Sequence, residues 1–437
     1  MSPVEQFLWA MLFFVCVYLV LMILMAAAGL VLGGMTRGPN ALHLLGMQPD
    51  EMLTEGQVLR TQHESSLAQF YALGLVAGLV LFYVSIPFIL AGLIGVTGGL
   101  LYLVLQARRV PGRLVVGIVI VGGAMIWAVL KSVFTRPGTG SFGLLKKPED
   151  CPKLYAIIND VARRIDTEPV SELYIAPGSS IGVHQEGRGP FGVFGVKRRV
   201  LTLGLSTMHY LTVSELQAIL AHEYAHFSHK DTFYSRFIYQ VQMSIEEALN
   251  GMGEAGGYLN YVNPFYWFMF AYYKSYSLLS AGFSRSREFL ADRMAVTLYG
   301  SDVFVSGLTK VSTDGTLFEM TMHDHVHELL AEGKAFTNMY AAFRDLREQA
   351  IKPEDREELY QKILAEEGSV FASHPTFKER VEAVMALPRA RDMNNQSALQ
   401  LFNDPEEIEK ELTEFMTAFA SYVKELQEQA AREAENS

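Results

Sequence analysis

The first third of the chain is dominated by long apolar runs that carry almost no charge. The run 7–32 contains no charged residue, and it exceeds the roughly 20 apolar residues that a helix needs to cross a bilayer. A cleaved signal peptide would have a basic residue ahead of a shorter run, whereas Glu5 stands in that place here. We therefore expect this run to stay in the protein as a membrane-spanning helix.

More apolar sequence follows before residue 135. The run 67–106 is uncharged, is too long for one span and is interrupted by Ser85 and Pro87. Proline removes a backbone donor and disfavours helix at the residue before it. We expect two spans here, 68–85 and 87–106, with a single kinked helix as the alternative.

A last apolar run, 114–134, completes an expected membrane region of about four spans within residues 1–135. An even number of spans would place the amino terminus and the rest of the chain on the same side. Basic residues flank the last span at both ends, so the positive-inside rule does not select a side.

Charge and cysteine content exclude two classes of function. The net charge is -11 and no basic face is apparent, which argues against a nucleic-acid partner. The only two cysteines, Cys16 and Cys151, are far apart, which excludes a disulfide framework and a thiolate metal site. Any metal must be bound by histidine and carboxylate groups.

From residue 148 the sequence has the pattern of a folded domain, which we expect to cover 148–390. Apolar residues from Leu154 to Ile165 recur at helical spacing. Two strand-like segments, 172–176 and 199–203, flank a Gly-rich stretch, 178–195, that is typical of a loop or hairpin. Thr212 followed by Glu215 is a capping-box pattern, which predicts the start of a helix.

This predicted helix contains the sequence Ala221-His222-Glu223-Tyr224-Ala225-His226. Residues four apart on a helix lie on one face, so both imidazoles can reach one ion. Glu223 could take a proton from a water bound to that ion and pass it on. The pattern is the H-E-x-x-H motif of zinc peptidases, although two solvated histidines on a surface helix would look the same.

A catalytic zinc needs one further protein ligand besides the two histidines. Glu288 and Asp292 lie four residues apart on another predicted helix, so Glu288 can coordinate while Asp292 lies behind it. The metzincin pattern does not fit, because Thr232 stands in the place of its third histidine.

Together these segments resemble the integral-membrane gluzincins that include HtpX-like proteases and the CAAX prenyl endopeptidases. The resemblance covers roughly 148–387. It is carried by the strand 200–203 leading into Leu211-Thr-Val-Ser-Glu-Leu, the His222 motif followed by Asp231, the Glu288-x-x-x-Asp292 segment, and Ser373-His374-Pro375 with Arg380.

The resemblance implies roles for these residues. His222, His226 and Glu288 would bind zinc, Glu223 would be the general base, and Asp292 would support a ligand. His374 would help near the developing oxyanion and Arg380 would be a positioning residue. Without the resemblance, Ser-His-Pro would equally be an ordinary turn before a helix. Relatives carry Asn-Ala-Phe on the substrate-binding edge strand, where this chain has Ser179 to Val183, so substrate contacts there are not transferred.

Three other segments have more than one interpretation. The aromatic stretch 261–283 is more typical of an interfacial or groove-lining helix than of a span, because Lys274 lies near its middle. His323, His325 and His327 could share a strand face and bind metal, but the helical pattern that follows favours a solvated helix. The extension 391–437 predicts an amphipathic helix starting at Asp404-Pro405.

We therefore expect a membrane α-helical region joined to an α-rich α+β zincin-type domain with a small sheet. The expected function is a zinc-dependent endopeptidase that acts on polypeptides and is held in a lipid bilayer. By resemblance it would lie in the cell's inner membrane with the catalytic domain in the cytoplasm. The alternatives are a CAAX-type prenyl-protein endopeptidase and a non-catalytic membrane scaffold that retains a structural zinc.

Overall fold

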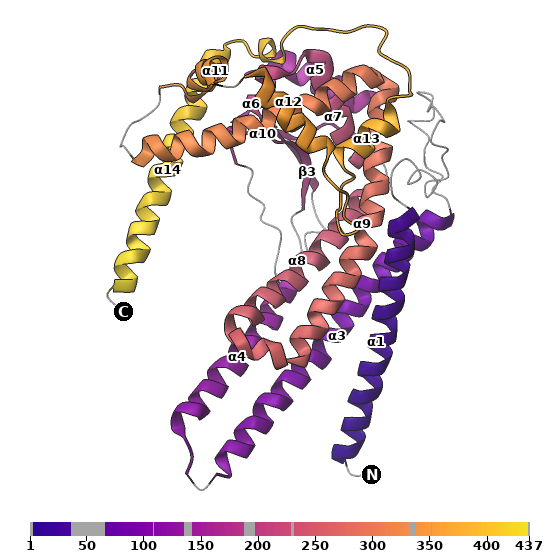
Figure 1. The fold of residues 1–437 in the computed structure, drawn as a ribbon, viewed down its shortest axis with the longest axis vertical. Coiled ribbons are helices and arrows are strands. Elements are labelled where there is room, and N and C mark those ends of the chain that lie inside the picture. The colour runs from indigo at the N-terminus through magenta and orange to yellow at the C-terminus, as the bar shows by residue number, and fades with distance from the viewer. Residues whose placement is uncertain are drawn as a thin grey trace.

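A computed structural model describes residues 3–35, 66–107, 109–134, 142–187, 197–228, 231–331, 337–350 and 352–435. It has two parts, a bundle of long helices and a mixed α/β domain at one end of that bundle (Figure 1). The bundle contains α1 (Pro3–Met35), α3 (Ser66–Leu105), α4 (Gly112–Phe134), α8 (Asp231–Gly256), the short η3 (Gly257–Val262) and α9 (Pro264–Tyr299).

Three helices in the described residues are long and apolar enough to cross a membrane. Their apolar segments are Cys16–Met35, Ala72–Leu105 and Gly112–Phe134. α1 rises from the free end of the bundle toward the α/β domain, α3 returns, and α4 rises again (Figure 1). The amino terminus and the α/β domain therefore lie at opposite ends of the bundle, contrary to the sequence-based expectation of four spans.

The structure has no turn between residues 85 and 87, because α3 continues through Pro87 as one helix, which was the alternative considered from the sequence. The buried Ser85 hydroxyl donates to the Phe82 carbonyl over 2.6 Å. Phe82, Ile86 and Ile89 are buried in the bundle core. Packing against neighbouring helices allows a membrane helix to tolerate proline, and sequence alone does not reveal these neighbours.

The helices α8 and α9 form a hairpin that returns at η3, about halfway along the bundle (Figure 1). α8 packs on α4, and α9 packs on α1 and α3. Met269, Tyr272 and Tyr276 of α9 are buried in the bundle core. The segment 261–283 thus packs within the bundle, and it is not among the candidate spans in the described residues.

The α/β domain contains a four-stranded sheet in the order β1-β2-β4-β3. β2 and β4 are parallel, and the edge strands β1 and β3 are antiparallel to their neighbours. The strands are β1 (Leu144–Lys146), β2 (Glu172–Ala176), β3 (Ile181–Gly187) and β4 (Lys197–Gly204). The predicted strands match β2 and β4, and the predicted loop or hairpin contains β3.

Helices surround the sheet and complete the domain. They are α5 (Pro152–Arg164), α6 (Leu205–Tyr210), α7 (Val213–Ser228), α10 (Ser301–Ala331), α11 (Met339–Ala350), α12 (Pro353–Leu364), α13 (Phe377–Val384), η4 (Ala398–Leu401) and α14 (Pro405–Glu435). Residues 323–327 are helical within α10, as predicted, but their histidine side chains lie outside the described part. α14 begins where Asp404-Pro405 predicts, and it buries Ile408 and Leu412 in the domain core.

Candidate metal centre

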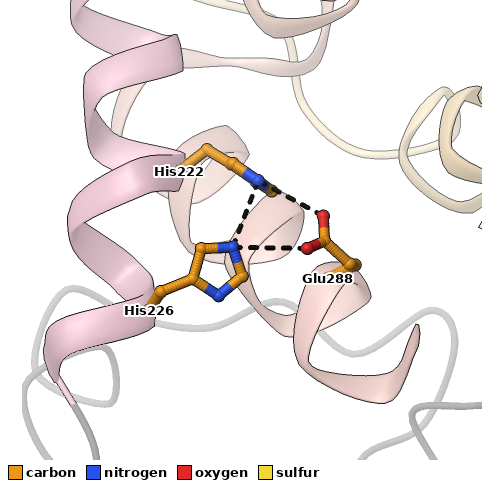
Figure 2. Close-up of side chains that lie close together, drawn as sticks. All are labelled: His222, His226 and Glu288. Carbon is orange, nitrogen blue, oxygen red and sulfur yellow. Dashed lines mark hydrogen bonds and ion pairs between the residues drawn. The ribbon is translucent and has the colours of Figure 1, made fainter. Parts of the chain in front are cut away.

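Helix α7 carries two of the candidate ligands. Its first turn is the predicted capping box: Thr212 N–H donates to the Glu215 carboxylate over 2.7 Å, and Glu215 N–H donates to the Thr212 hydroxyl over 3.3 Å. Lys310 of α10 holds the same carboxylate at 2.8 Å. With its start fixed on both sides, α7 presents His222 and His226 one turn apart toward α9 (Figure 2).

Helix α9 crosses α7 and carries the other candidate ligand. Glu288 is 6% exposed and Asp292 is fully buried. Arg287 and Arg293 of the same helix are buried as well. This segment is therefore not a solvent-facing helix on which acids and arginines merely pair.

The imidazoles and the Glu288 carboxylate converge on one point (Figure 2). His222 Nε2 lies 3.4 Å from His226 Nε2 and 3.4 Å from Glu288 Oε2, and His226 Nε2 lies 3.5 Å from Glu288 Oε1. Ligand atoms about 2.0–2.1 Å from a tetrahedral zinc are separated from one another by about 3.4 Å. The three groups thus have the spacing and donor types that a zinc ion requires.

Asp292 and Arg380 form a buried support behind His222. Asp292 Oδ1 lies 2.8 Å from His222 Nδ1. Arg380 donates to both oxygens of Asp292, over 2.9 Å from Nε and 2.5 Å from Nη2. The N–H group at His222 Nδ1 donates a hydrogen bond to Asp292. The other ring nitrogen, Nε2, is the one that can bind a metal.

The electrostatics of the site keep both acids ionised. Burial alone would raise the pKa of Asp292, but the Arg380 charge and hydrogen bonds from Arg380 and His222 outweigh it and lower that pKa. Burial likewise opposes ionisation of Glu288, yet its hydrogen bonds to His222 and His374 hold the pKa well below the usual range.

The two histidines respond differently to the same surroundings. Burial lowers the pKa of His226 to about 4. Burial and Arg380 also act to lower the pKa of His222, but the hydrogen bonds to Asp292 and Glu288 prevail and raise it to about 9. In the metal-free protein near neutral pH, His226 is therefore neutral and His222 is protonated.

Glu223 lies on α7 between the two histidines and is half-buried. Burial raises the pKa of its carboxyl group, and Glu288 adds to the rise, while His222, Arg380 and a hydrogen bond from the Val183 backbone oppose it. Val183 belongs to β3, so the edge of the sheet lies beside Glu223. This strand lies within the loop or hairpin predicted over 178–195, where the family resemblance also places an edge strand.

His374 reaches the site from the loop before α13. Its Nδ1 lies 3.0 Å from Glu288 Oε1, and its side chain is 69% exposed. Thr376 caps α13 through a reciprocal pair of hydrogen bonds with Glu379. This cap sets the path of the chain that brings His374 and Arg380 to the same place.

Sequence reasoning missed Arg285, which holds the His374 loop in place. Its Nη1 donates to the carbonyls of Ala372 (2.7 Å) and Val370 (3.3 Å), and its Nη2 donates to the Gly33 carbonyl at the end of α1 (3.3 Å). Arg285 is 4% exposed. The sequence shows a basic residue three positions before Glu288, but it does not show which groups this residue contacts, because those groups are distant in the sequence.

Comparison with known proteins agrees with this geometry. Residues 191–387 match Peptidase family M48. The chain is 27% identical over 168 residues to the "Protease HtpX homolog" of Acaryochloris marina, a match covering 36% of this chain and 54% of that protein. It is 29% identical over 176 residues to the homolog from Moorella thermoacetica, covering 38% and 56% of the two chains.

A third relative is "Protease HtpX" of Aliivibrio salmonicida, 29% identical over 137 residues, with 27% of this chain and 46% of the relative covered. The chain thus spans about half the length of the curated relatives it matches. No solved structure matches it. With its membrane-type helices and its convergent histidines and glutamate, the chain resembles the HtpX proteases, and its residues 191–387 match peptidase family M48.

Proposed function

We propose that this protein is a membrane-anchored zinc endopeptidase whose metal is held by His222, His226 and Glu288. The observation that carries the proposal is the set of 3.4–3.5 Å separations among the three ligand atoms. Two imidazoles and one carboxylate form the donor set of many catalytic zinc sites, in which one position is left open for water or substrate.

A bound zinc ion supplies a Lewis acid that lowers the pKa of water and polarises a carbonyl group. The remaining chemistry belongs to the protein. Glu223 takes a proton from the attacking water and delivers it to the nitrogen of the leaving amine. Its raised pKa suits both steps, since a carboxyl group that releases its proton too readily is a poor acid.

The residues around Glu223 complete the proposed mechanism. His374 stands exposed beside Glu288 and can donate to the carbonyl oxygen of the scissile bond as negative charge develops there. Arg380 acts through Asp292, which it holds against His222. These two roles follow the family resemblance as well as the contacts.

The sheet edge suggests how a polypeptide binds. Within the described residues, β3 pairs with β4 on one side only, and its residue Val183 lies beside Glu223. An extended polypeptide can add to such an edge through main-chain hydrogen bonds. This would place the backbone of the polypeptide next to Glu223. Main-chain hydrogen bonds do not depend on which side chains this protein has at residues 179–183.

The three apolar helices support a position in a bilayer. By resemblance we assign this to the cell's inner membrane, with the α/β domain in the cytoplasm and membrane or misfolded polypeptides as the substrates. A CAAX-type peptidase is less well supported, because that group surrounds its site with more membrane helices. A purely structural zinc is also less well supported, since structural sites use four protein ligands.

The test is Glu223→Gln in the full-length protein. We expect stoichiometric zinc by metal analysis, but cleavage of an unfolded fluorescent polypeptide should slow by about a hundredfold to ten-thousandfold, the contribution of a general base. Thermal melting of both proteins controls for folding. Wild-type cleavage by the zinc-loaded variant would refute the proposed mechanism.

A further inference from the structure

An apolar cavity of about 420 Å³ lies in the bundle, away from the metal site. Its walls are the halves of α3 and α4 farther from the α/β domain, and the start of α9 closes one end. Only two lining side chains are polar. Asn263 already caps α9 by accepting hydrogen bonds from Phe265 and Tyr266 N–H, and the Thr97 side chain packs on Gly122. The cavity therefore offers hydrocarbon surface.

The length of the cavity matches the depth of one leaflet. Along α4 its lining extends from Leu114 to Met125, eleven residues later. At 1.5 Å per residue this is about 16 Å, and half of a bilayer's hydrocarbon core is about 15 Å. Phe265 closes the inner end. The outer end is next to Arg113 and Arg109, which are exposed where α3 connects to α4.

The shape of the cavity favours a thin occupant. Its volume of about 420 Å³ is distributed along about 16 Å of α4. An extended hydrocarbon chain is thinner than a helix, which is about 10–12 Å wide with its side chains, and therefore suits the cavity better. The cavity is also continuous with the apolar surface of α3 and α4, on which Val96, Leu100 and Leu114 are about half exposed.

We propose that the cavity binds one acyl chain of a glycerophospholipid from the leaflet farther from the α/β domain. The lipid phosphate would pair with Arg109 and Arg113, since guanidinium groups bind phosphate through paired hydrogen bonds. The proposal depends on α3 and α4 lying in a bilayer, and it is independent of the peptidase chemistry. A bound chain would brace Phe265, at the start of the helix that carries Glu288.

Two glycines of α4 provide a matched pair of variants. A Cβ atom at Gly117 or at Gly123 would meet no atom within 4 Å, so a side chain can be added at either position without an immediate clash. Gly117 lines the cavity and Gly123 does not. Gly117→Leu therefore fills the cavity, while Gly123→Leu makes the same change in composition outside it.

The experiment titrates the full-length protein in detergent with palmitoyl-oleoyl-phosphatidylglycerol and counts bound lipids by native mass spectrometry. The wild type and Gly123→Leu should retain one tightly bound lipid and melt at a higher temperature with it. Gly117→Leu should bind that lipid at least tenfold more weakly and should lose the thermal shift. Far-ultraviolet circular dichroism shows whether each variant is folded.

A further variant, Arg109→Gln with Arg113→Gln, tests the phosphate contact and should weaken retention while leaving the cavity intact. Unchanged retention in that variant would overturn the headgroup assignment. Equal lipid retention by Gly117→Leu and Gly123→Leu, or no retained lipid in the wild type, would overturn the acyl-chain site. None of these readouts measures proteolysis, so failure of the lipid site is distinguishable from failure of the proposed enzyme.

Discussion

Glu288 and Asp292 lie one turn apart on α9, but they contact different atoms. Glu288 approaches His222 Nε2 and His226 Nε2, the two nitrogens that would face a metal. Asp292 contacts only the opposite nitrogen of His222, Nδ1. We therefore expect one acid to bind the metal directly and the other to act through a ligand.

Substituting the two acids separately tests this division. Glu288→Ala leaves two imidazoles, too few protein ligands for a stable catalytic zinc, and should lose its metal on purification. Asp292→Ala should weaken zinc binding only about 10- to 100-fold, so added zinc should partly restore activity. Metal analysis of the two purified variants distinguishes the two roles. A normal zinc content in Glu288→Ala would show that Glu288 is not a zinc ligand.

The histidine pKa values predict how zinc affinity depends on pH. His222 is protonated below about pH 9 in the metal-free protein, and a ligand histidine must be neutral, so zinc binding releases this proton. Affinity should rise about tenfold per unit between pH 7 and 9 and then level off. His226, whose pKa is lowered to about 4, should add no dependence in this range.

Chelator competition at several pH values measures the effect. Asp292→Asn is the matched control, because it keeps the shape of the side chain and removes the charge that stabilises protonated His222. Its zinc affinity should level off at a lower pH. A flat profile in the wild type from pH 7 to 9 would contradict the assignment of the proton to His222.

At the scale of single elements, α9 both carries Glu288 and holds the loop that ends at His374. Arg285 provides this second function through the Ala372 and Val370 carbonyls. Lys274 provides a second contact, with its ammonium group 5.2 Å from the centre of the Phe371 ring. The position of His374 beside Glu288 therefore depends on α9 at two points.

Replacing Arg285 should slow the reaction without removing the metal. Arg285→Gln cannot donate to three carbonyls at once, so His374 should be displaced and kcat should fall by about tenfold to a hundredfold. KM and zinc content should change little. Arg285→Lys, which keeps the charge and some donors, should recover part of the rate. Wild-type kcat in a folded, zinc-loaded Arg285→Gln protein would contradict this function.

The elements predicted well from the sequence are those specified by local patterns. The α7 cap needs only Thr212 and Glu215, and α14 starts at Asp404-Pro405, as predicted. The continuity of α3 depends on packing around Pro87 by helices distant in sequence. The contacts of Arg285 join it to residues 85 and 252 positions away, and no periodicity or local motif carries that information.

At the scale of the whole molecule, α9 joins two separate cores. Phe283 belongs to the apolar core of the bundle, and Phe289 belongs to the core of the α/β domain. Glu288 lies between them, at the boundary of the two cores. The candidate metal site therefore lies where the membrane-type helices meet the α/β domain.

The direction of the helices predicts the topology of the chain. α1, α3 and α4 alternate in direction, and the amino terminus lies at the end of the bundle away from the α/β domain (Figure 1). If each of these helices crosses once, the amino terminus and Lys147 lie on opposite sides of the membrane. The α8–α9 hairpin does not alter this, since it leaves and returns to the same end of the bundle.

Reporter fusions at the amino terminus and after Lys147 test the topology in cells. Alkaline phosphatase is active only outside the cytoplasm, and a fluorescent protein that folds only in the cytoplasm gives the complementary signal. We expect the amino-terminal fusion to report the outside and the Lys147 fusion to report the cytoplasm. A fusion at Gln106, between α3 and α4, should agree with the amino-terminal one. If the amino terminus and Lys147 report the same compartment, the number of crossings between them is even. In that case α1, α3 and α4 do not each cross the membrane once.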